Sequence, residues 1–207
     1  MPSKSGFIKG KILIGITGGI GSGKSLAAHY FEKFGGKVIN ADMLTKELYR
    51  TDSALKSKLV KAFGEGMLDE HGFVSGPNAR NIIFSSEENI KRVNKLVHPF
   101  VIEALRKIIE KMKSRVVFIE SAIAFESGFY KKLDYIVMVY SPDNLRVQRV
   151  MMRDGAKKED VEKLMNLQYP EELKLKRANF ILKNEGRKID LKKAVKDLIK
   201  IIDRIKH

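Results

Sequence analysis

The chain has 207 residues, of which 43% are hydrophobic and 31% charged, and its formal net charge is +15. These proportions are typical of a globular protein, and the length suffices for one α/β core with an inserted lobe rather than two large domains. No apolar run approaches the roughly 20 residues of a membrane-spanning helix, and the absence of cysteine excludes disulfides, thiolate metal sites and cysteine nucleophiles. We therefore expect a cytoplasmic protein that has no membrane contact.

The positive charge first suggests a nucleic-acid-binding ATPase, but the lysines are spread along the chain rather than gathered in one tract. A solvated helix face accounts for the lysines near the C-terminus, which are spaced four residues apart opposite an apolar stripe. The sequence also contains no cluster of aromatic residues for base stacking. We expect no specific nucleic-acid partner. The lysines of this face are Lys188, Lys192, Lys196 and Lys200.

The strongest motif is a phosphate-binding loop (P-loop), Gly18-x-x-x-x-Gly23-Lys24-Ser25, which follows an apolar strand at residues 12–16. Its glycines allow positive φ angles and close approach to a ligand, and its N–H groups can surround phosphate at the start of the next helix. We expect Lys24 to contact the β- and γ-phosphates and Ser25 to ligate Mg²⁺. The pattern does not specify the phosphate acceptor. The expected ATP-binding residues are Gly19, Ile20, Gly21, Ser22, Gly23, Lys24, Ser25 and Leu26.

Two later strands are also expected to end in polar residues at the ligand-binding edge of a parallel sheet. Asn40-Ala41-Asp42 follows a short strand at residues 37–39. Asp42 is either the N-cap of a helix over residues 43–49 or a general base opposite the triphosphate, and the pattern leaves both open. A strand over residues 115–120 ends in Glu120, which we expect to contact Mg²⁺ directly or through water.

Residues 52–113 show no strong strand signal and are expected to form a helical lobe. The predicted helices cover residues 54–63, 78–84 and 87–113, and a glycine-rich turn region covers residues 64–76. Pro99 should interrupt the last helix or begin a new one, because proline has no N–H to donate. His98 is either a capping or packing residue or part of a ligand site.

A fourth strand over residues 134–140 precedes a helix in which Ser141 is expected at the N-cap and Pro142 at the first helical position. Arg146, Arg149 and Arg153 fall on one side of this helix. They are either solvated or cover the charge of a phosphoryl-transfer transition state. A second helix over residues 157–168 completes a predicted lid. The last elements are a strand over residues 179–182 and a helix over residues 190–205.

In this order the motifs resemble the dephospho-coenzyme A kinase family over about residues 11 to 205. The loop alone is generic, but the ordered set is specific. The matching segments are Thr17 to Ser25, Ala41-Asp42, His98-Pro99, Phe125-Glu126-Ser127-Gly128, Gln148-Arg149, Arg153-Asp154-Gly155, Gln168 and Asn184-x-Gly186.

Members of this family transfer the γ-phosphate of ATP to the ribose 3′-hydroxyl of 3′-dephospho-CoA, the last step of coenzyme A synthesis. The resemblance implies a P-loop NTPase fold with a three-layer α/β core and a parallel five-stranded sheet. The chain would form one kinase domain over residues 1–207. Its core would comprise residues 11–50, 114–142 and 178–207, its inserted helical acceptor-binding lobe residues 51–113, and its helical lid residues 143–177.

The resemblance also implies roles for individual residues. Asp42 would be the base for the 3′-hydroxyl, Lys24 and Ser25 with Mg²⁺ would hold the triphosphate, and Arg149 and Arg153 would close over it from the lid. We expect ATP and 3′-dephospho-CoA as ligands, and a monomer or weak homo-oligomer. The remaining assignments are Asn184 to ATP, Glu120 to Mg²⁺, and Arg80, His98, Phe125 and Glu126 to the acceptor.

The chain departs from the usual family pattern at several positions. It has Asn40 and Asn179 where aspartate is usual, Leu26 for threonine, Ala122 for proline, and Gly76 near an expected arginine.

Two rival functions remain. Another P-loop kinase, for a nucleoside monophosphate or a shikimate-like alcohol, would differ in its acceptor lobe. A regulatory GTPase would need Asn-Lys-x-Asp, but the chain's Asn-Lys pair is followed by Leu-Val.

Overall fold

A computed structural model describes residues 6–74, 79, 81–83 and 85–205, and it divides the chain into two compact units. Unit 1 is built from the segment that ends at Asn40 and the segment that begins at Met112, and unit 2 comprises Ala41–Lys111. The inserted lobe was expected to begin at residue 51, whereas unit 2 begins immediately after the second strand. The assignment of the whole chain to one kinase domain stays a prediction.

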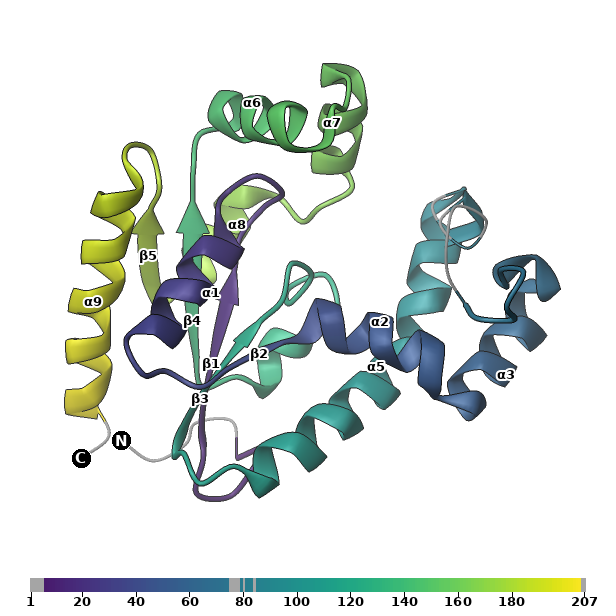
Figure 1. Ribbon diagram of the computed structural model, residues 1–207, viewed down its shortest axis with the longest axis horizontal. Helices are drawn as coiled ribbons and strands as arrows, with labels where there is room; N and C mark the ends of the chain where they lie inside the picture. Colours follow the sequence, from purple (N-terminus) through teal and green to yellow (C-terminus); the bar gives the residue numbers. More distant parts are fainter. Residues whose placement is uncertain (1–5, 75–78, 80, 84, 206–207) are drawn as a thin grey trace. The chain divides into compact units, whose positions relative to one another are not determined.

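Unit 1 contains a five-stranded sheet in the order β2-β3-β1-β4-β5, in which all neighbouring strands are parallel (Figure 1). This confirms the predicted α/β class and the parallel five-stranded sheet. β1, β3 and β4 are apolar and buried along nearly their whole length, as expected for central strands covered on both faces. The strands are β1 (Ile12–Thr17), β2 (Val38–Asn40), β3 (Val116–Glu120), β4 (Tyr135–Tyr140) and β5 (Phe180–Lys183).

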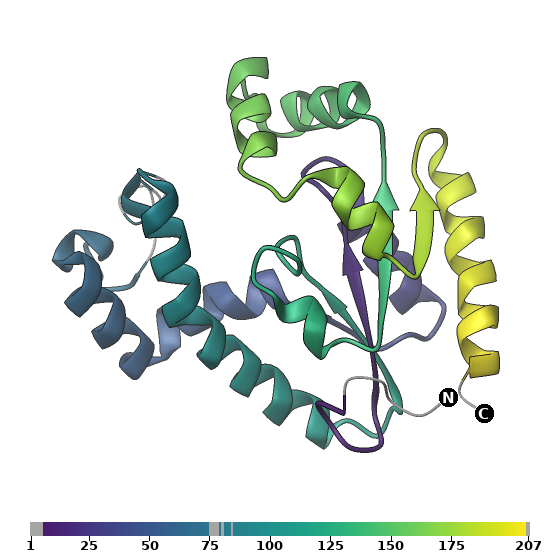
Figure 2. The same ribbon diagram turned by 180° about the vertical axis from the view of Figure 1, so that it is seen from behind.

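Helices cover both faces of this sheet. α1 (Lys24–Lys33) and α9 (Lys188–Ile205) pack on one face, where Phe31 and Val195 join the alternate β1 residues in one core (Figure 1). The short helices α8 (Glu171–Arg177) and η2 (Phe129–Lys132) lie over the opposite face (Figure 2). The sequence analysis did not anticipate α8.

Two further helices, α6 (Asp143–Asp154) and α7 (Lys158–Asn166), pack against each other beyond the carboxyl end of β4 (Figure 1). Val147, Val150 and Val161 form a small core between them. These helices lie within residues 143–177, the segment predicted as the lid, and the second of them ends at Asn166 rather than at residue 168.

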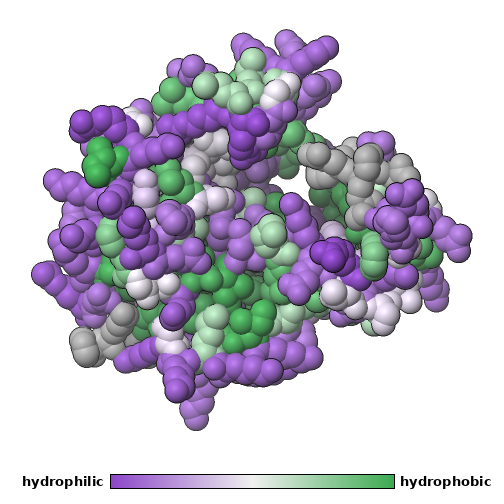
Figure 3. All heavy atoms as spheres, viewed as in Figure 1, coloured by the Kyte–Doolittle hydropathy of each residue, from purple (hydrophilic) through white to green (hydrophobic). Residues whose placement is uncertain are grey.

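The lysine-rich face of α9 is exposed as predicted, except that Lys192 is half-buried. Hydrophilic residues dominate the surface over this helix in Figure 3, and the apolar stripe opposite them is buried. No helix among the described residues has the length and apolar character needed to cross a membrane. The buried stripe consists of Leu191, Val195, Leu198 and Ile202.

Unit 2 is helical in the part that the structure describes. α2 (Ala41–Thr51) and α3 (Ser53–Phe63) contact α5 (Glu87–Lys111), and the 3-10 turn η1 (Glu65–Met67) follows α3. Asp52 caps α3 by accepting a hydrogen bond from the N–H of Leu55 at 2.8 Å. Asn78 and Phe84, the ends of the helix predicted between α3 and α5, lie outside the described residues, as does Gly76.

The prediction of a break at Pro99 is wrong, because α5 continues through this residue. A proline inside a helix costs roughly 3 kcal/mol or more. A stripe of apolar side chains with a spacing of four residues runs past Pro99 and is buried, and each such side chain contributes roughly 1.5–3 kcal/mol. Burial of the stripe therefore outweighs the lost hydrogen bond. The stripe consists of Val93, Val97, Val101, Leu105 and Ile109.

Candidate active site

The P-loop connects β1 to α1 and ends at Gly23, the residue before α1. Gly21 and Gly23 have φ angles of 77° and 90°, which residues other than glycine rarely adopt. The space beside the glycines is already filled by protein. A Cβ on Gly19 would collide with the Arg146 guanidinium, and one on Gly23 with the Asn184 amide. Close packing against α6 and the loop after β5 therefore accounts for the absence of side chains at Gly19 and Gly23.

A cavity of about 410 Å³ opens beside the loop. Lys24 and Ser25 line it together with Arg149 and Arg153 of α6, so the cations predicted from the motif and from the lid face one space. The other lining residues are Gly18, Gly19, Ile20, Gly21, Gly23, Leu26, Ala122, Val150 and Gln168.

Glu120 lies at the centre of the polar contacts at this edge of the sheet. Its Oε1 accepts hydrogen bonds from Ser25 Oγ at 2.6 Å and from Lys24 Nζ at 3.0 Å, and its Oε2 accepts one from Asn40 Nδ2 at 2.8 Å. Asn40 and Glu120 face each other in the β2–β3 register, which explains their contact. Glu120 is only 3% exposed, so these bonds and the Lys24 charge stabilise its carboxylate away from water.

Ser25 and Glu120 fit a magnesium site in which the protein supplies only one or two of the ligands. Mg²⁺ in phosphoryl-transfer enzymes is usually held by one or two oxygen ligands of the protein, with phosphate oxygens and water supplying the rest. Ser25 Oγ and Glu120 Oε1 are hard oxygen ligands 2.6 Å apart beside the loop. No group of three or more His, Cys, Asp or Glu residues within the described ranges forms a metal cage. The donor set thus suits a metal that arrives with a nucleotide.

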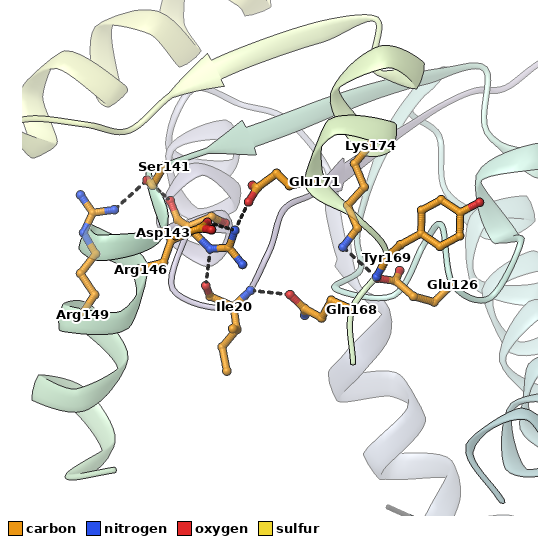
Figure 4. A network of polar contacts seen from close by, with 11 residues as sticks. Ile20, Glu126, Ser141, Asp143, Arg146, Arg149, Gln168, Tyr169, Glu171 and Lys174 are labelled. Carbon is orange, nitrogen blue, oxygen red and sulfur yellow. Dashed lines mark hydrogen bonds and ion pairs between the residues drawn. The ribbon is translucent and has the colours of Figure 1, made fainter. Parts of the chain in front are cut away.

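Ser141 is not the N-cap of α6, contrary to the prediction. The helix begins at Asp143, with Pro142 at the N-cap, and no side chain caps it. The buried Ser141 hydroxyl instead accepts a hydrogen bond from Arg149 Nη1 at 2.8 Å (Figure 4). It also donates to the Asn184 carbonyl at 2.6 Å. The hydroxyl is engaged by groups distant in sequence, which a local capping pattern does not reveal.

Asn184 and Arg149 are joined in this same network. Arg149 Nη2 donates to the Asn184 carbonyl at 2.9 Å, and Asn184 Nδ2 donates to the Ser22 carbonyl at 2.8 Å. The loop after β5 is thereby fixed to the P-loop on one side and to α6 on the other. Asn184 was predicted to bind ATP and Arg149 to act in catalysis, and the structure brings the two residues together beside the P-loop.

The three arginines of α6 have different environments. Arg146 is 4% exposed and donates to the Ile20 carbonyl, whereas Arg149 faces the cavity. Arg153 contacts Asp154, is largely exposed and also lines the cavity. The hydrogen bond from Arg153 to Asp154 raises the pKa of the guanidinium. The arginines are therefore not a uniformly solvated face, and Arg153 is the most exposed of the three.

The predicted acceptor residue Glu126 follows β3 and is tied to the end of the lid segment. Its Oε1 lies 2.8 Å from Lys174 Nζ and accepts from the Tyr169 N–H at 2.8 Å (Figure 4). Lys174 is 1% exposed, which is unusual for a lysine and requires this partner. The neighbouring Phe125 is buried and packs against the Tyr130 ring.

The remaining predicted site residues belong to unit 2. Asp42 lies in the first turn of α2, which begins at Ala41, so the N-cap interpretation of Asp42 is wrong. A carboxylate in this turn still interacts favourably with the helix dipole. His98 lies within α5, its Nε2 is buried without a hydrogen-bond partner in the described part of the chain, and burial lowers its pKa below the usual 6.5. Arg80 lies outside the described residues.

Comparison with known proteins agrees with this geometry. A family model for dephospho-CoA kinase matches residues 12–190. The chain belongs to the dephospho-CoA kinase family. The dephospho-CoA kinase of Leptospira interrogans is 39% identical over 191 residues, which cover 92% of each chain.

Solved structures support the same placement. The protein TT1252 from Thermus thermophilus superposes with a TM-score of 0.80 at 33% identity, covering 92% of this chain and 97% of its own. A dephospho-CoA kinase from Campylobacter jejuni gives a TM-score of 0.68 at 26% identity, with coverages of 94% and 98%. The resemblance that the motifs predicted is thus confirmed over nearly the whole chain.

Three residues of this dephospho-CoA kinase family member were not among the predicted site residues, although their contacts join the segments around the P-loop. Ser141 was interpreted only as a cap, Arg146 only as one of three arginines, and Lys174 was not considered. Their common signal is burial of a polar or charged side chain, since all three are at most 4% exposed. Burial of this kind depends on contacts between segments far apart in sequence, which composition and periodicity do not reveal.

Proposed function

We propose that this chain transfers the γ-phosphate of ATP to the ribose 3′-hydroxyl of 3′-dephospho-CoA, with Mg²⁺ as the cofactor. Family membership supports the reaction. The structural observation that carries the proposal is the convergence of Lys24, Ser25 and Asn40 on the buried Glu120 beside the P-loop cavity. This arrangement supplies a cation for phosphate and oxygen ligands for a metal at one point.

The triphosphate would lie along the loop with its β- and γ-phosphates at Lys24. Lys24 would exchange its contact with Glu120 for the phosphate oxygens, because an ammonium group has three donors and a flexible stem. Mg²⁺ held by Ser25 and Glu120 would neutralise phosphate charge and orient the γ-phosphate. Because Ser25 Oγ already donates to Glu120, its lone pairs remain available for the metal.

The chemical step forms a bond between the 3′-oxygen and the γ-phosphorus and breaks the bond from that phosphorus to the β–γ bridging oxygen. Asp42 would orient the hydroxyl and accept its proton late in the reaction, since the transition state is loose. Arg149 and Arg153 would stabilise the charge that develops on the transferred group. His98, Phe125 and Glu126 are proposed to contact the acceptor, with Arg80 as a further candidate.

The variant Asp42→Asn tests the assignment of the base. It should bind ATP and 3′-dephospho-CoA almost normally, because an amide preserves the shape of the side chain. Its kcat should fall by roughly 10²–10⁴-fold, the usual contribution of a general base. Asn40→Ala is the control; it removes one hydrogen bond to Glu120 and should cost far less activity. Wild-type turnover of Asp42→Asn would reject this role, and Glu126 would become the next candidate.

The expectation of a monomer or weak homo-oligomer and that of a cytoplasmic location remain predictions. Gel filtration with light scattering would measure the first, and it requires no assumption about the reaction.

A further inference from the structure

The N–H groups of the P-loop fall into two sets. Ile20 N–H donates to Gln168 Oε1 at 3.0 Å, and Ser22 N–H donates to the Gly19 carbonyl at 3.1 Å. The N–H groups of Gly19, Gly21 and Gly23, in contrast, donate to no acceptor among the residues that the structure describes. The glycine amides are therefore the ones that remain available for an anion.

Arg146 holds the other polar atom of Ile20. Its Nε donates to the Ile20 carbonyl at 3.0 Å, while its Nη1 contacts Asp143 at 3.0 Å and also Glu171 (Figure 4). The guanidinium is thus fixed by α6, by α8 and by the loop itself. Because Gln168 and Arg146 bind the N–H and the carbonyl of the same residue, Ile20 is held on both sides by the lid segment.

Capture of the Ile20 carbonyl also determines the direction of the next N–H. In a trans peptide the carbonyl and the following N–H point in opposite directions. Arg146 therefore turns the free Gly21 N–H away from itself. Glycine tolerates several backbone conformations at this position, so without the Arg146 hydrogen bond the Ile20–Gly21 peptide could rotate. The rotated peptide would present a carbonyl oxygen where phosphate oxygens bind.

The position of Arg146 relative to the cavities agrees with a role in orienting the Ile20–Gly21 peptide. Arg146 does not line the cavity that contains Lys24 and Ser25, but lines a second cavity of about 290 Å³ together with Glu171 and Lys174. The two cavities share Gly19 and Gln168. Arg146 thus contacts the loop from the side of the second cavity.

We propose that Arg146 is a positioning residue for phosphate binding, which holds the Ile20–Gly21 peptide so that the glycine N–H groups face the nucleotide. The proposal deepens the proposed function and rests on it for the identity of the ligand. Its distinguishing feature is that the Nε donor, rather than the positive charge, carries the effect.

Three substitutions separate the donor from the charge. Glutamine places its Nε2 at the same distance along the side chain as arginine Nε, so Arg146→Gln keeps a donor for Ile20 but loses both ion pairs. Arg146→Met has a side chain of similar size and loses the donor for Ile20 as well as the ion pairs. Arg146→Lys keeps the charge for Asp143 and Glu171 but places a carbon where Nε was.

The experiment measures the affinity for a non-hydrolysable ATP analogue by calorimetry, and the ¹⁵N–¹H resonance of Gly21 in glycine-labelled protein. We expect Arg146→Met and Arg146→Lys to bind the analogue about 10–100-fold more weakly, since mispositioned groups typically cost this much, and Arg146→Gln to stay within about threefold of wild type. The analogue should shift the Gly21 resonance in wild type and Arg146→Gln only.

If Arg146 acts only through its ion pairs with Asp143 and Glu171, the variants should rank in the opposite order of affinity for the ATP analogue. Arg146→Lys would then resemble wild type, while the Gln and Met variants would be equally impaired, and this result would overturn the proposal. If Arg146→Met does not fold, the comparison of Arg146→Gln with Arg146→Lys still decides between the two explanations. The affinity is measured without an acceptor, so a failure of the acceptor assignment would leave this test intact and would appear separately as absent transfer to 3′-dephospho-CoA.

Discussion

The contact of the Asn40 amide with Glu120 makes Asn40→Asp an informative perturbation of the proposed magnesium site. Asn40 Nδ2 donates to Glu120 Oε2 at 2.8 Å, and Glu120 is 3% exposed. Aspartate cannot donate this bond, so the substitution removes a hydrogen bond to a charged group, worth about 1.5–3 kcal/mol. It also places a second carboxylate beside the first.

The size of the effect follows from these contacts. Two like charges about 4 Å apart repel by roughly 4 kcal/mol at an effective dielectric constant near 20. Uptake of a proton by the pair limits this cost, because a neutral carboxyl group is not repelled by its charged neighbour. Lys24, with its Nζ 3.0 Å from Glu120, offsets part of the repulsion. We expect the free energy of unfolding to fall by about 2–4 kcal/mol at neutral pH.

The sign of the pH dependence is fixed by the shared proton. Repulsion between the two carboxylates favours a shared proton in the folded variant, so the deficit relative to wild type should grow as pH rises from the unfolded carboxyl pKa of about 4 toward neutral pH, where that proton is lost. Added Mg²⁺ should restore stability to the variant more than to wild type, because a divalent cation compensates the second carboxylate. Urea unfolding with and without Mg²⁺ measures both effects.

Asn179→Asp is the matched control, since it is the same chemical change at another position where the family usually has aspartate. Asn179 Oδ1 accepts a hydrogen bond from the Ile136 N–H at 2.8 Å, and a carboxylate can accept it equally well. Its stability should stay within about 0.5 kcal/mol of wild type. The reasoning is refuted if Asn40→Asp unfolds at the same urea concentration as wild type and does not respond to Mg²⁺.

Three further predictions follow from the site. Lys24→Ala should fold normally by circular dichroism but lose transfer, and wild-type turnover in this variant would remove the phosphate assignment. Arg149→Ala and Arg153→Ala should lower kcat more than they weaken acceptor binding, by about 10³-fold if they act on the transition state; lost ATP affinity with unchanged kcat would make them ground-state ligands. The lowered pKa of His98 means that its contribution to stability is complete above the unfolded pKa near 6.5 and is lost as pH falls through the folded pKa. Thermal unfolding of His98→Asn should therefore depend less on pH in this range, and an unchanged pH profile would contradict this.

The sheet and the P-loop were predictable because each is specified by local sequence. An apolar strand such as β1 is recognised from its composition, and the loop from the fixed spacing of Gly18, Gly23, Lys24 and Ser25. Glu120 was anticipated for a related reason, since strand ends in a parallel sheet converge on one edge. The family resemblance supplied the larger plan.

The elements that were missed depend on contacts between distant segments. α8 has seven residues, most of them charged, and no apolar periodicity; its buried Lys174 is stabilised by Glu126, 48 positions earlier in the chain. Pro99 carries a local signal for a break, but the packed stripe of α5 overrides it. Arg146 could be recognised as an arginine of one helix face, whereas its contact with the Ile20 carbonyl required the fold.

The most direct test of the central claim is release of ADP from ATP and Mg²⁺, measured with and without 3′-dephospho-CoA. Parallel reactions with a nucleoside monophosphate and with shikimate test the rival acceptors. We predict ADP release only with 3′-dephospho-CoA, in step with the appearance of a 3′-phosphate on the acceptor. ADP release that is independent of 3′-dephospho-CoA, or that is stimulated equally by another acceptor, would contradict the assigned reaction.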